Sequence, residues 1–320
     1  MKMIHHEVEV IGPGASRGHC TPASMGEAFR LVQPLVNGAV SMAFRYRSAP
    51  RGPRPPWLTS ASGVDFTDMS WGSRGNAVFH FNAPRLGDAA SSLYRQKELF
   101  KTRPRKDDTA FDLVGDVLAD VGAENRDSHR FDTQLLSKVN CFRRAMKCGV
   151  EALIFRGDRL PQDGTRILNR TVSEVASRLQ RETPAPRRVR VRGKLDMIRD
   201  SDGAFALLIE SGQSVPCVWL PDDRSVLGKY WCKPVVIEGV AVFCASESLL
   251  RLEAEAIAAA GSIAGSFSAA PKPIAASLDK RSLRKRQTAR TGLSAVFGQW
   301  PGEETEEELL AALKEMRSPV

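Results

Sequence analysis

An alternating run of basic residues near position 190 has the clearest chemical meaning in this sequence. Its cations are Arg188, Arg190, Arg192 and Lys194. Successive side chains of a β-strand point to opposite faces, so these four would share one face of a strand. A row of cations can follow a phosphate backbone, and aromatic rings can stack on bases. We therefore predict nucleic-acid contact by this face, with Trp219 and Tyr230 as stacking residues; the alternative is a face that is simply solvated.

A second basic run lies closer to the C-terminal end, where Arg284, Lys285 and Arg286 are consecutive. A basic segment outside a folded domain can bind DNA or RNA as an arm. The alternative is solvation, or pairing with the glutamates that begin at Glu303, because the two runs have opposite charge and lie close in sequence. We include the three cations among the predicted nucleic-acid-binding residues.

Four aspartates recur at intervals of four residues and would lie along one face of a helix. They are Asp108, Asp112, Asp116 and Asp120. Metal binding or acid–base catalysis would need these carboxylates to converge with groups from elsewhere, so a solvated face is the simpler interpretation. Docking of this acidic ladder against the Arg-rich strand is another alternative. A metal-dependent nuclease that uses Asp112 and Asp116 is the enzymatic hypothesis that the ladder leaves open.

The histidines and cysteines do not form a recognisable site. His5, His6, His19 and Cys20 could meet if the first strand folds back, yet their spacing matches no zinc motif. The loop from Gly12 to Gly18 departs from the common phosphate-binding patterns, and we expect it only to turn the chain. We therefore predict no catalytic residues, no metal and no cofactor, and we incline towards a protein that is not an enzyme.

Changes of pattern divide the chain into four predicted segments. Residues 1–185 mix helix and strand patterns and predict an α+β domain of unknown function. Residues 186–257 predict a small five-stranded β-barrel, OB-like or alternatively SH3-like, because five short alternating runs surround one helical turn. Residues 258–302 predict a flexible basic linker, and an apolar stripe among glutamates predicts a short amphipathic helix within the C-terminal tail, 303–320.

Local signals predict where the elements of the first segment begin. The predicted helix starts carry residue types that favour the N-cap, namely Ser24, Asp108 or Thr109, Asp127 and Thr171. A helix is also predicted over Leu86–Phe100, and a β-hairpin is predicted to pair residues 64–70 with 76–82.

The composition is that of a globular protein with a basic surplus. The chain has 320 residues, 42% of them hydrophobic, and a formal net charge of +9, which favours polyanionic partners. The six cysteines include no C-x-x-C pair, which favours free thiols in a reducing compartment. We find neither a signal-peptide pattern nor a run apolar enough to span a membrane, and therefore expect a cytoplasmic protein.

The segment from Phe297 to Leu310, which reads FGQWPGEETEEELL, resembles the tails of short bacterial proteins, some of antitoxin type. The rest of the chain resembles uncharacterised bacterial proteins without an assigned activity. The resemblance implies a bacterial protein whose tail contacts a partner protein. A short helix gains stability by docking its apolar stripe. The predicted partner-binding residues are Phe297, Trp300, Leu309, Leu313 and Met316.

These features predict a non-enzymatic adaptor that joins nucleic acid to a protein partner. The barrel face and the basic run would contact DNA or RNA, the tail would contact protein, and no membrane contact is expected. Two alternatives stay open. One is a pure protein-interaction or assembly subunit whose charges only keep it in solution, and the other is an enzyme with its site in residues 1–185.

Overall fold

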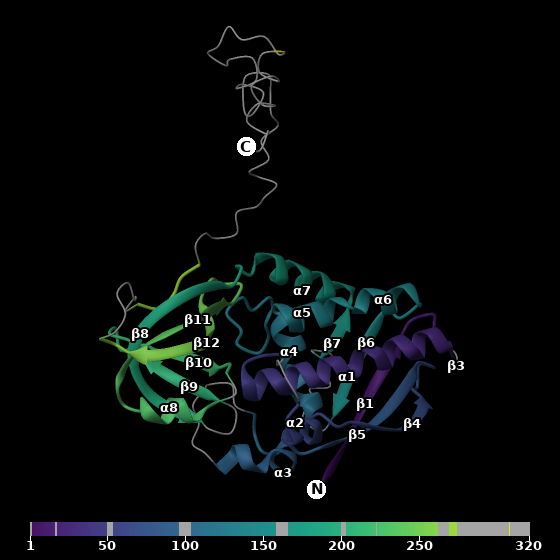
Figure 1. Cartoon of the computed structure of the whole chain (residues 1–320). Helices are drawn as coiled ribbons and strands as arrows, with labels where there is room; N and C mark the ends of the chain where they lie inside the picture. Colours follow the sequence, from purple (N-terminus) through teal and green to yellow (C-terminus); the bar gives the residue numbers. More distant parts are fainter. Residues whose placement is uncertain are drawn as a thin grey trace. The chain divides into compact units, whose positions relative to one another are not determined.

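A five-stranded sheet and a closed five-stranded barrel are the main β-structures of the chain (Figure 1). The computed structural model describes residues 2–16, 18–49, 54–95, 104–157, 166–199, 203–221, 223–261, 269–273 and 307. The chain divides into two compact units, Met1–Ala276 and Ser277–Val320, and Glu307 is the described residue of the second. The predicted mixture of helices and strands and the predicted barrel are confirmed.

The sheet is antiparallel throughout, in the order β4-β5-β1-β6-β7. Its strands are β1 (Met3–Ile11), β4 (Asp65–Trp71), β5 (Ala77–Pro84), β6 (Ala152–Gly157) and β7 (Ile167–Asn169). Alternation along β1 buries His6, Val8 and Val10 and places His5 and Glu7 on the opposite face. The predicted hairpin is confirmed as β4 and β5. A smaller hairpin joins β2 (Ala15–Ser16) to β3 (His19–Cys20).

Helices pack on the apolar face of this sheet, where side chains of β1, β5 and β6 form one core with those of the helices. The helices are α1 (Pro22–Arg45), α2 (Pro56–Ala61), α3 (Leu86–Ala89), α4 (Ala110–Gly122), α5 (Thr133–Asn140), α6 (Phe142–Lys147) and α7 (Arg170–Glu182), with a 3₁₀ turn at Ser91–Arg95. A membrane-spanning helix, which needs a long and strongly apolar run, is not found among the described residues.

Three predicted helix caps are wrong, because in each helix the side chain of a different nearby residue accepts the hydrogen bond from the first turn. The N-cap of α1 is Thr21, and Ser24 instead donates to the Cys148 carbonyl. The N-caps of α5 and α7 are Asp132 and Asn169, not Asp127 and Thr171. Thr109 caps α4 as predicted, with Asp112 completing a capping box.

The helix predicted over Leu86–Phe100 is also wrong in its length. Helix α3 ends at Ala89, and a 3₁₀ turn follows; residues 96–100 lie outside the described part of the chain. The amides of Leu86 and Gly87 donate to the carbonyls of Asp108 and Lys106, so this stretch is held by a distant segment. These bonds satisfy the first amides of α3, which have no partner within the helix.

The barrel closes in the order β10-β12-β11-β8-β9. Its elements are β8 (Arg187–Arg199), β9 (Ala204–Leu208), β10 (Ser214–Trp219), α8 (Ser225–Lys229), β11 (Pro234–Phe243) and β12 (Leu249–Ala259). Strands β10 and β12 are parallel, and the other neighbours are antiparallel. Because β12 continues to Ala259, the segment predicted to begin a linker at residue 258 is still strand there.

The turn between β11 and β12 belongs to the core of the helices and not to the interior of the barrel. Val242, Cys244, Ala245 and Leu250 are buried with the apolar residues of α1, α4 and α5. The barrel interior is a separate cluster that includes Phe205, Leu207, Cys217 and Leu252. Residues 1–185 and the barrel therefore share a packed seam within the first compact unit.

Candidate nucleic-acid interface

The basic row lies on the outer face of β8. Arg188, Arg190, Arg192 and Lys194 are exposed and alternate with buried residues that line the barrel. The four side chains therefore share one face of the strand, as the alternating sequence predicted.

Charge pairing divides this row into two halves. Arg188 lies 2.5 Å from Glu255 on β12, and Arg190 lies 3.3 Å from Glu238 on β11. Arg192 and Lys194 form no ion pair with any residue that the structure describes. Within the described part of the chain, the second half of the row is therefore the half whose charge is not offset by a paired carboxylate.

The two aromatic residues predicted to stack on bases are not open ring surfaces. Trp219 is 7% exposed, faces the barrel interior and donates from Nε1 to the Asp223 carbonyl at 2.8 Å. Tyr230 is partly buried against the same core. Trp219 is buried because it continues the inward-facing positions of Val215 and Cys217.

The exposed ring at this end of the barrel belongs to Trp231, which is 61% exposed. Trp231 follows α8 in a tight turn in which Cys232 takes a left-handed backbone conformation, with φ of 59°. The Cys232 amide donates to the Leu195 carbonyl at 2.9 Å, and the Leu195 amide donates to the Lys233 carbonyl at 3.1 Å. These bonds hold the turn beside Lys194.

Exposed cations surround this turn. We call Arg192, Lys194, Lys229, Trp231 and Lys233 the Trp231 patch. All five are exposed, and none of the four cations has an ion pair among the residues that the structure describes. Lys233 Nζ donates to the Lys229 backbone carbonyl at 2.8 Å, which holds the Lys233 side chain against the end of α8. The nearby Asp223 carboxyl has a lowered pKa, first because it accepts hydrogen bonds from Ser225 and also because Lys229 is close.

The charge of the barrel as a whole is not basic. Residues 186–257 contain ten Lys and Arg and ten Asp and Glu, so their formal net charge is zero. The surplus of +9 therefore lies outside the barrel. Any attraction of the barrel for a polyanion depends on local arrangement, as in the Trp231 patch.

The carboxylates of the acidic ladder bind to groups within residues 1–185. Asp112 completes the α4 capping box, Asp116 lies 2.7 Å from Arg166, and Asp120 lies 3.0 Å from Arg130. Its alternative partner, the Arg-rich strand, pairs instead with Glu238 and Glu255. The described contacts thus assign the ladder to helix capping and ion pairing.

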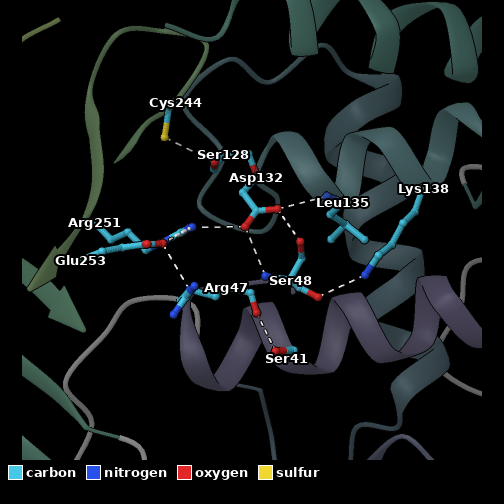
Figure 2. Close-up of polar contacts among 10 residues, drawn as sticks. All are labelled: Ser41, Arg47, Ser48, Ser128, Asp132, Leu135, Lys138, Cys244, Arg251 and Glu253. Atoms are coloured by element: carbon cyan, nitrogen blue, oxygen red, sulfur yellow. Dashed lines mark hydrogen bonds and ion pairs between the residues drawn. The ribbon is translucent and has the colours of Figure 1, made fainter. Parts of the chain in front are cut away.

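A buried ionic network crosses the seam between the barrel and the helices (Figure 2). The Asp132 carboxylate accepts from Ser48 and from the Leu135 amide and lies 3.4 Å from Arg251. Glu253 lies 3.2 Å from Arg47 and 2.8 Å from Arg251. The four charged side chains are between 5% and 12% exposed and balance in charge. Such a saturated network suits a structural role.

Lys138 borders this network and donates to the Ser48 carbonyl at 3.1 Å (Figure 2). Burial lowers the pKa of Lys138, although Asp132 opposes this effect. Burial also raises the pKa of Cys244, in the adjoining β11–β12 turn, to about 11. With charged side chains that are at most 12% exposed, the seam is largely shielded from water.

The predicted His and Cys set does not assemble. His6 is buried on the helix side of β1, with its Nε2 2.9 Å from the Thr109 hydroxyl, whereas His19 and Cys20 lie in the β2–β3 hairpin. His5 lies on the other face of β1, beside Glu7 and His80. Sequence reasoning missed this group, because the contact with His80 follows from strand pairing.

Gly14 to Gly18 match the letters of the nucleophile pattern G-x-S-x-G, although this loop was expected only to turn the chain. In hydrolases that pattern places the serine at a sharp turn between a strand and a helix. Ser16 instead lies in the short strand β2, opposite His19. The local backbone therefore does not form a nucleophile elbow.

The remaining predicted site residues lie outside the described part of the chain. They are Arg284, Lys285 and Arg286 of the basic run and Phe297, Trp300, Leu309, Leu313 and Met316 of the tail. Their roles in nucleic-acid and partner binding stay predictions, as does the resemblance of the tail to antitoxin-type proteins.

Comparison with known proteins gives no relative for this chain: no family model matches it, and no significant similarity is found to a curated protein or to a solved structure.

Proposed function

We propose that the protein binds single-stranded nucleic acid through the Trp231 patch of an OB-like barrel. The observation that carries the proposal is an exposed Trp231 ring next to four cations that lack ion-pair partners in the described chain. Stacking on an aromatic ring needs an unstacked base, and cations beside the ring can contact the flanking phosphates. These requirements favour a single strand over a duplex.

The barrel topology supports the OB-like assignment. Its first strand pairs with the second and fourth, its third strand runs parallel to the fifth, and a short helix lies between the third and fourth. This connectivity is typical of OB folds, many of which bind oligonucleotides. OB folds commonly use the loop between the last two strands for their ligand, whereas here Cys244 and Ala245 of that loop pack into the core of the helices. The proposed interface lies instead at α8 and the adjoining part of β8.

The proposal is tested by fluorescence anisotropy with labelled single-stranded DNA and RNA over a salt series. We expect Trp231→Ala to weaken binding by about 1–3 kcal/mol, the usual worth of one stacked base. Arg192→Ala with Lys194→Ala is expected to lower the slope of log K against log salt by about 1.4, since each phosphate contact on a single strand contributes about 0.7.

Arg188→Ala with Arg190→Ala is the matched control, because it removes two cations from the same strand that are already paired with glutamates. We expect this variant to bind nearly as well as the wild type. Equal binding by Trp231→Ala and the wild type would contradict the proposed interface, and no binding by the wild type at low salt would remove the function.

A further inference from the structure

Three metal-ligating side chains converge on the face of the sheet that points away from the helices. His5 and Glu7 are two residues apart on β1, and His80 on β5 is the cross-strand partner of Glu7. His5 Nε2 and His80 Nδ1 are 3.2 Å apart. Glu7 Oε1 lies 3.8 Å from the first nitrogen and 3.7 Å from the second. The three atoms form a small, nearly equilateral triangle.

The size of this triangle fits a tetrahedral metal ion. Ligands held about 2.1 Å from a tetrahedral ion lie about 3.4 Å from one another. Of the three separations between the ligand atoms, 3.2 Å is slightly shorter than this ideal distance, and 3.7 and 3.8 Å are slightly longer. An ion could therefore bind after shifts of a few tenths of an ångström, without movement of the strands.

Ser70 on β4 prepares His80 for such a role. The Ser70 hydroxyl oxygen lies 2.6 Å from His80 Nε2, the ring nitrogen that points away from the triangle. When Ser70 accepts the Nε2 proton, the lone pair of Nδ1 is directed towards His5 and Glu7. Histidine ligands of metals commonly donate their second nitrogen to an oxygen in this way.

Glu7 differs from the next glutamate on the same face. Glu9 accepts hydrogen bonds from Asn76 and Arg156 and is mostly buried. Within the described residues, the polar partners of the Glu7 carboxylate are the two imidazoles. No described Lys or Arg side chain forms an ion pair with Glu7, so a protonated imidazole or a bound metal ion would be its direct counter-charge.

We propose that His5, Glu7 and His80 bind a divalent transition-metal ion of the zinc class. Two imidazole nitrogens and one carboxylate suit zinc and its neighbours, whereas Mg²⁺ and Ca²⁺ prefer oxygen ligands. The His5 and Glu7 side chains are 55% and 39% exposed, so the fourth position of the ion faces solvent and holds water. An ion with such an open position can activate water or polarise a bound oxygen, which extends the protein beyond nucleic-acid binding.

A second group, Asp127, His129 and Cys244, also has three candidate ligand atoms close together. Its carboxylate already accepts from the hydroxyls of Ser246 and Ser248, and the Cys244 thiol lies within 3.6 Å of the Ser128 carbonyl. Its buried thiol has a raised pKa, which opposes the thiolate that a metal needs. This group is therefore the weaker candidate and the natural comparison.

The test is calorimetric titration of the full-length protein, free of any affinity tag, with Zn²⁺, followed by Co²⁺ absorption spectroscopy. We expect His5→Ala and His80→Ala to weaken Zn²⁺ binding by at least about 100-fold, and Ser70→Ala by about tenfold, as for loss of an outer hydrogen bond. His19→Ala, an exposed histidine in the β2–β3 hairpin, is expected to bind as the wild type does.

Co²⁺ distinguishes the two candidate groups, because a cysteine ligand adds a sulfur charge-transfer band that a His–His–Glu site lacks. If the proposal is right, the Co²⁺ spectrum lacks this band and Cys244→Ser binds Zn²⁺ as tightly as the wild type does. Wild-type affinity in His5→Ala would overturn it, since the exposed His5 can be removed without disturbing the core. Loss of binding in Cys244→Ser alone would place the ion at the seam and equally overturn it.

Discussion

The guanidinium of Arg251, on the last barrel strand, lies 3.4 Å from the carboxylate of Asp132, which also caps helix α5. Both side chains are buried, and together they tie β12 to the helical layer. Removing Asp132 would leave Arg47 and Arg251 with Glu253 as their shared carboxylate, and so one excess positive charge in the buried network.

We therefore expect Asp132→Ala to lower the free energy of unfolding by about 3–5 kcal/mol through the unbalanced buried charge, with about 1 kcal/mol more from the lost cap. Urea unfolding measures the change. Arg126→Ala breaks the exposed pair between Arg126 and Glu182 and serves as the control, with an expected cost of at most about 1 kcal/mol. Similar costs for the two variants would contradict the role given to the seam.

Two glycines of the barrel are expected to respond oppositely to alanine. A Cβ at Gly239 would lie 2.1 Å from the Glu253 carbonyl oxygen, where the register of β11 and β12 shifts, whereas a Cβ at Gly228 in α8 meets nothing within 4 Å. We expect Gly239→Ala to cost about 1–3 kcal/mol through overpacking, and Gly228→Ala to gain up to about 1 kcal/mol. Thermal unfolding of both variants checks the signs, and a neutral Gly239→Ala would show that the strands can separate there.

The depressed pKa of Lys138 predicts a dependence of stability on alkaline pH. A lysine whose pKa is lower in the folded protein opposes folding while it is charged in both states, and this penalty is relieved as the pH rises from the folded pKa towards the unfolded value of about 10.4. We expect the wild type to gain stability relative to Lys138→Met over that interval, as measured by urea unfolding at each pH. Lys147→Met alters an exposed lysine of α6 and should show no such trend.

Alkylation of the native cysteines can show where single-stranded nucleic acid binds, without any change to the protein sequence. Cys232 is exposed next to Trp231, and Cys141 is exposed between α5 and α6. A saturating oligonucleotide is expected to slow the reaction of iodoacetamide with Cys232 and to leave Cys141 unchanged, as followed by peptide mass spectrometry. Protection of both thiols, or of Cys141 alone, would argue against contact at the Trp231 patch.

Strand alternation made the barrel the most predictable part of the chain. Val189 and Val191 alternate with arginines along β8, and glycine turns separate the first three strands, so strand positions could be predicted from local sequence. The same rule, applied further along, would also have placed Trp219 inside, in phase with Val215 and Cys217.

The pairings that decide the candidate sites could not be predicted in this way. Glu255 neutralises Arg188 from 67 residues away, and His80 meets His5 from 75 residues away. Such contacts depend on strand order and register, which a single sequence does not specify.

The burial of the β11–β12 turn among the helices has a consequence for how the chain is made. A ribosome releases residues 1–185 well before Val242 and Leu250, yet these later side chains complete the core of the earlier helices. Domains generally fold from the N-terminal end during synthesis. Here the first helical layer must wait, with part of its apolar surface uncovered, until the final hairpin of the barrel emerges.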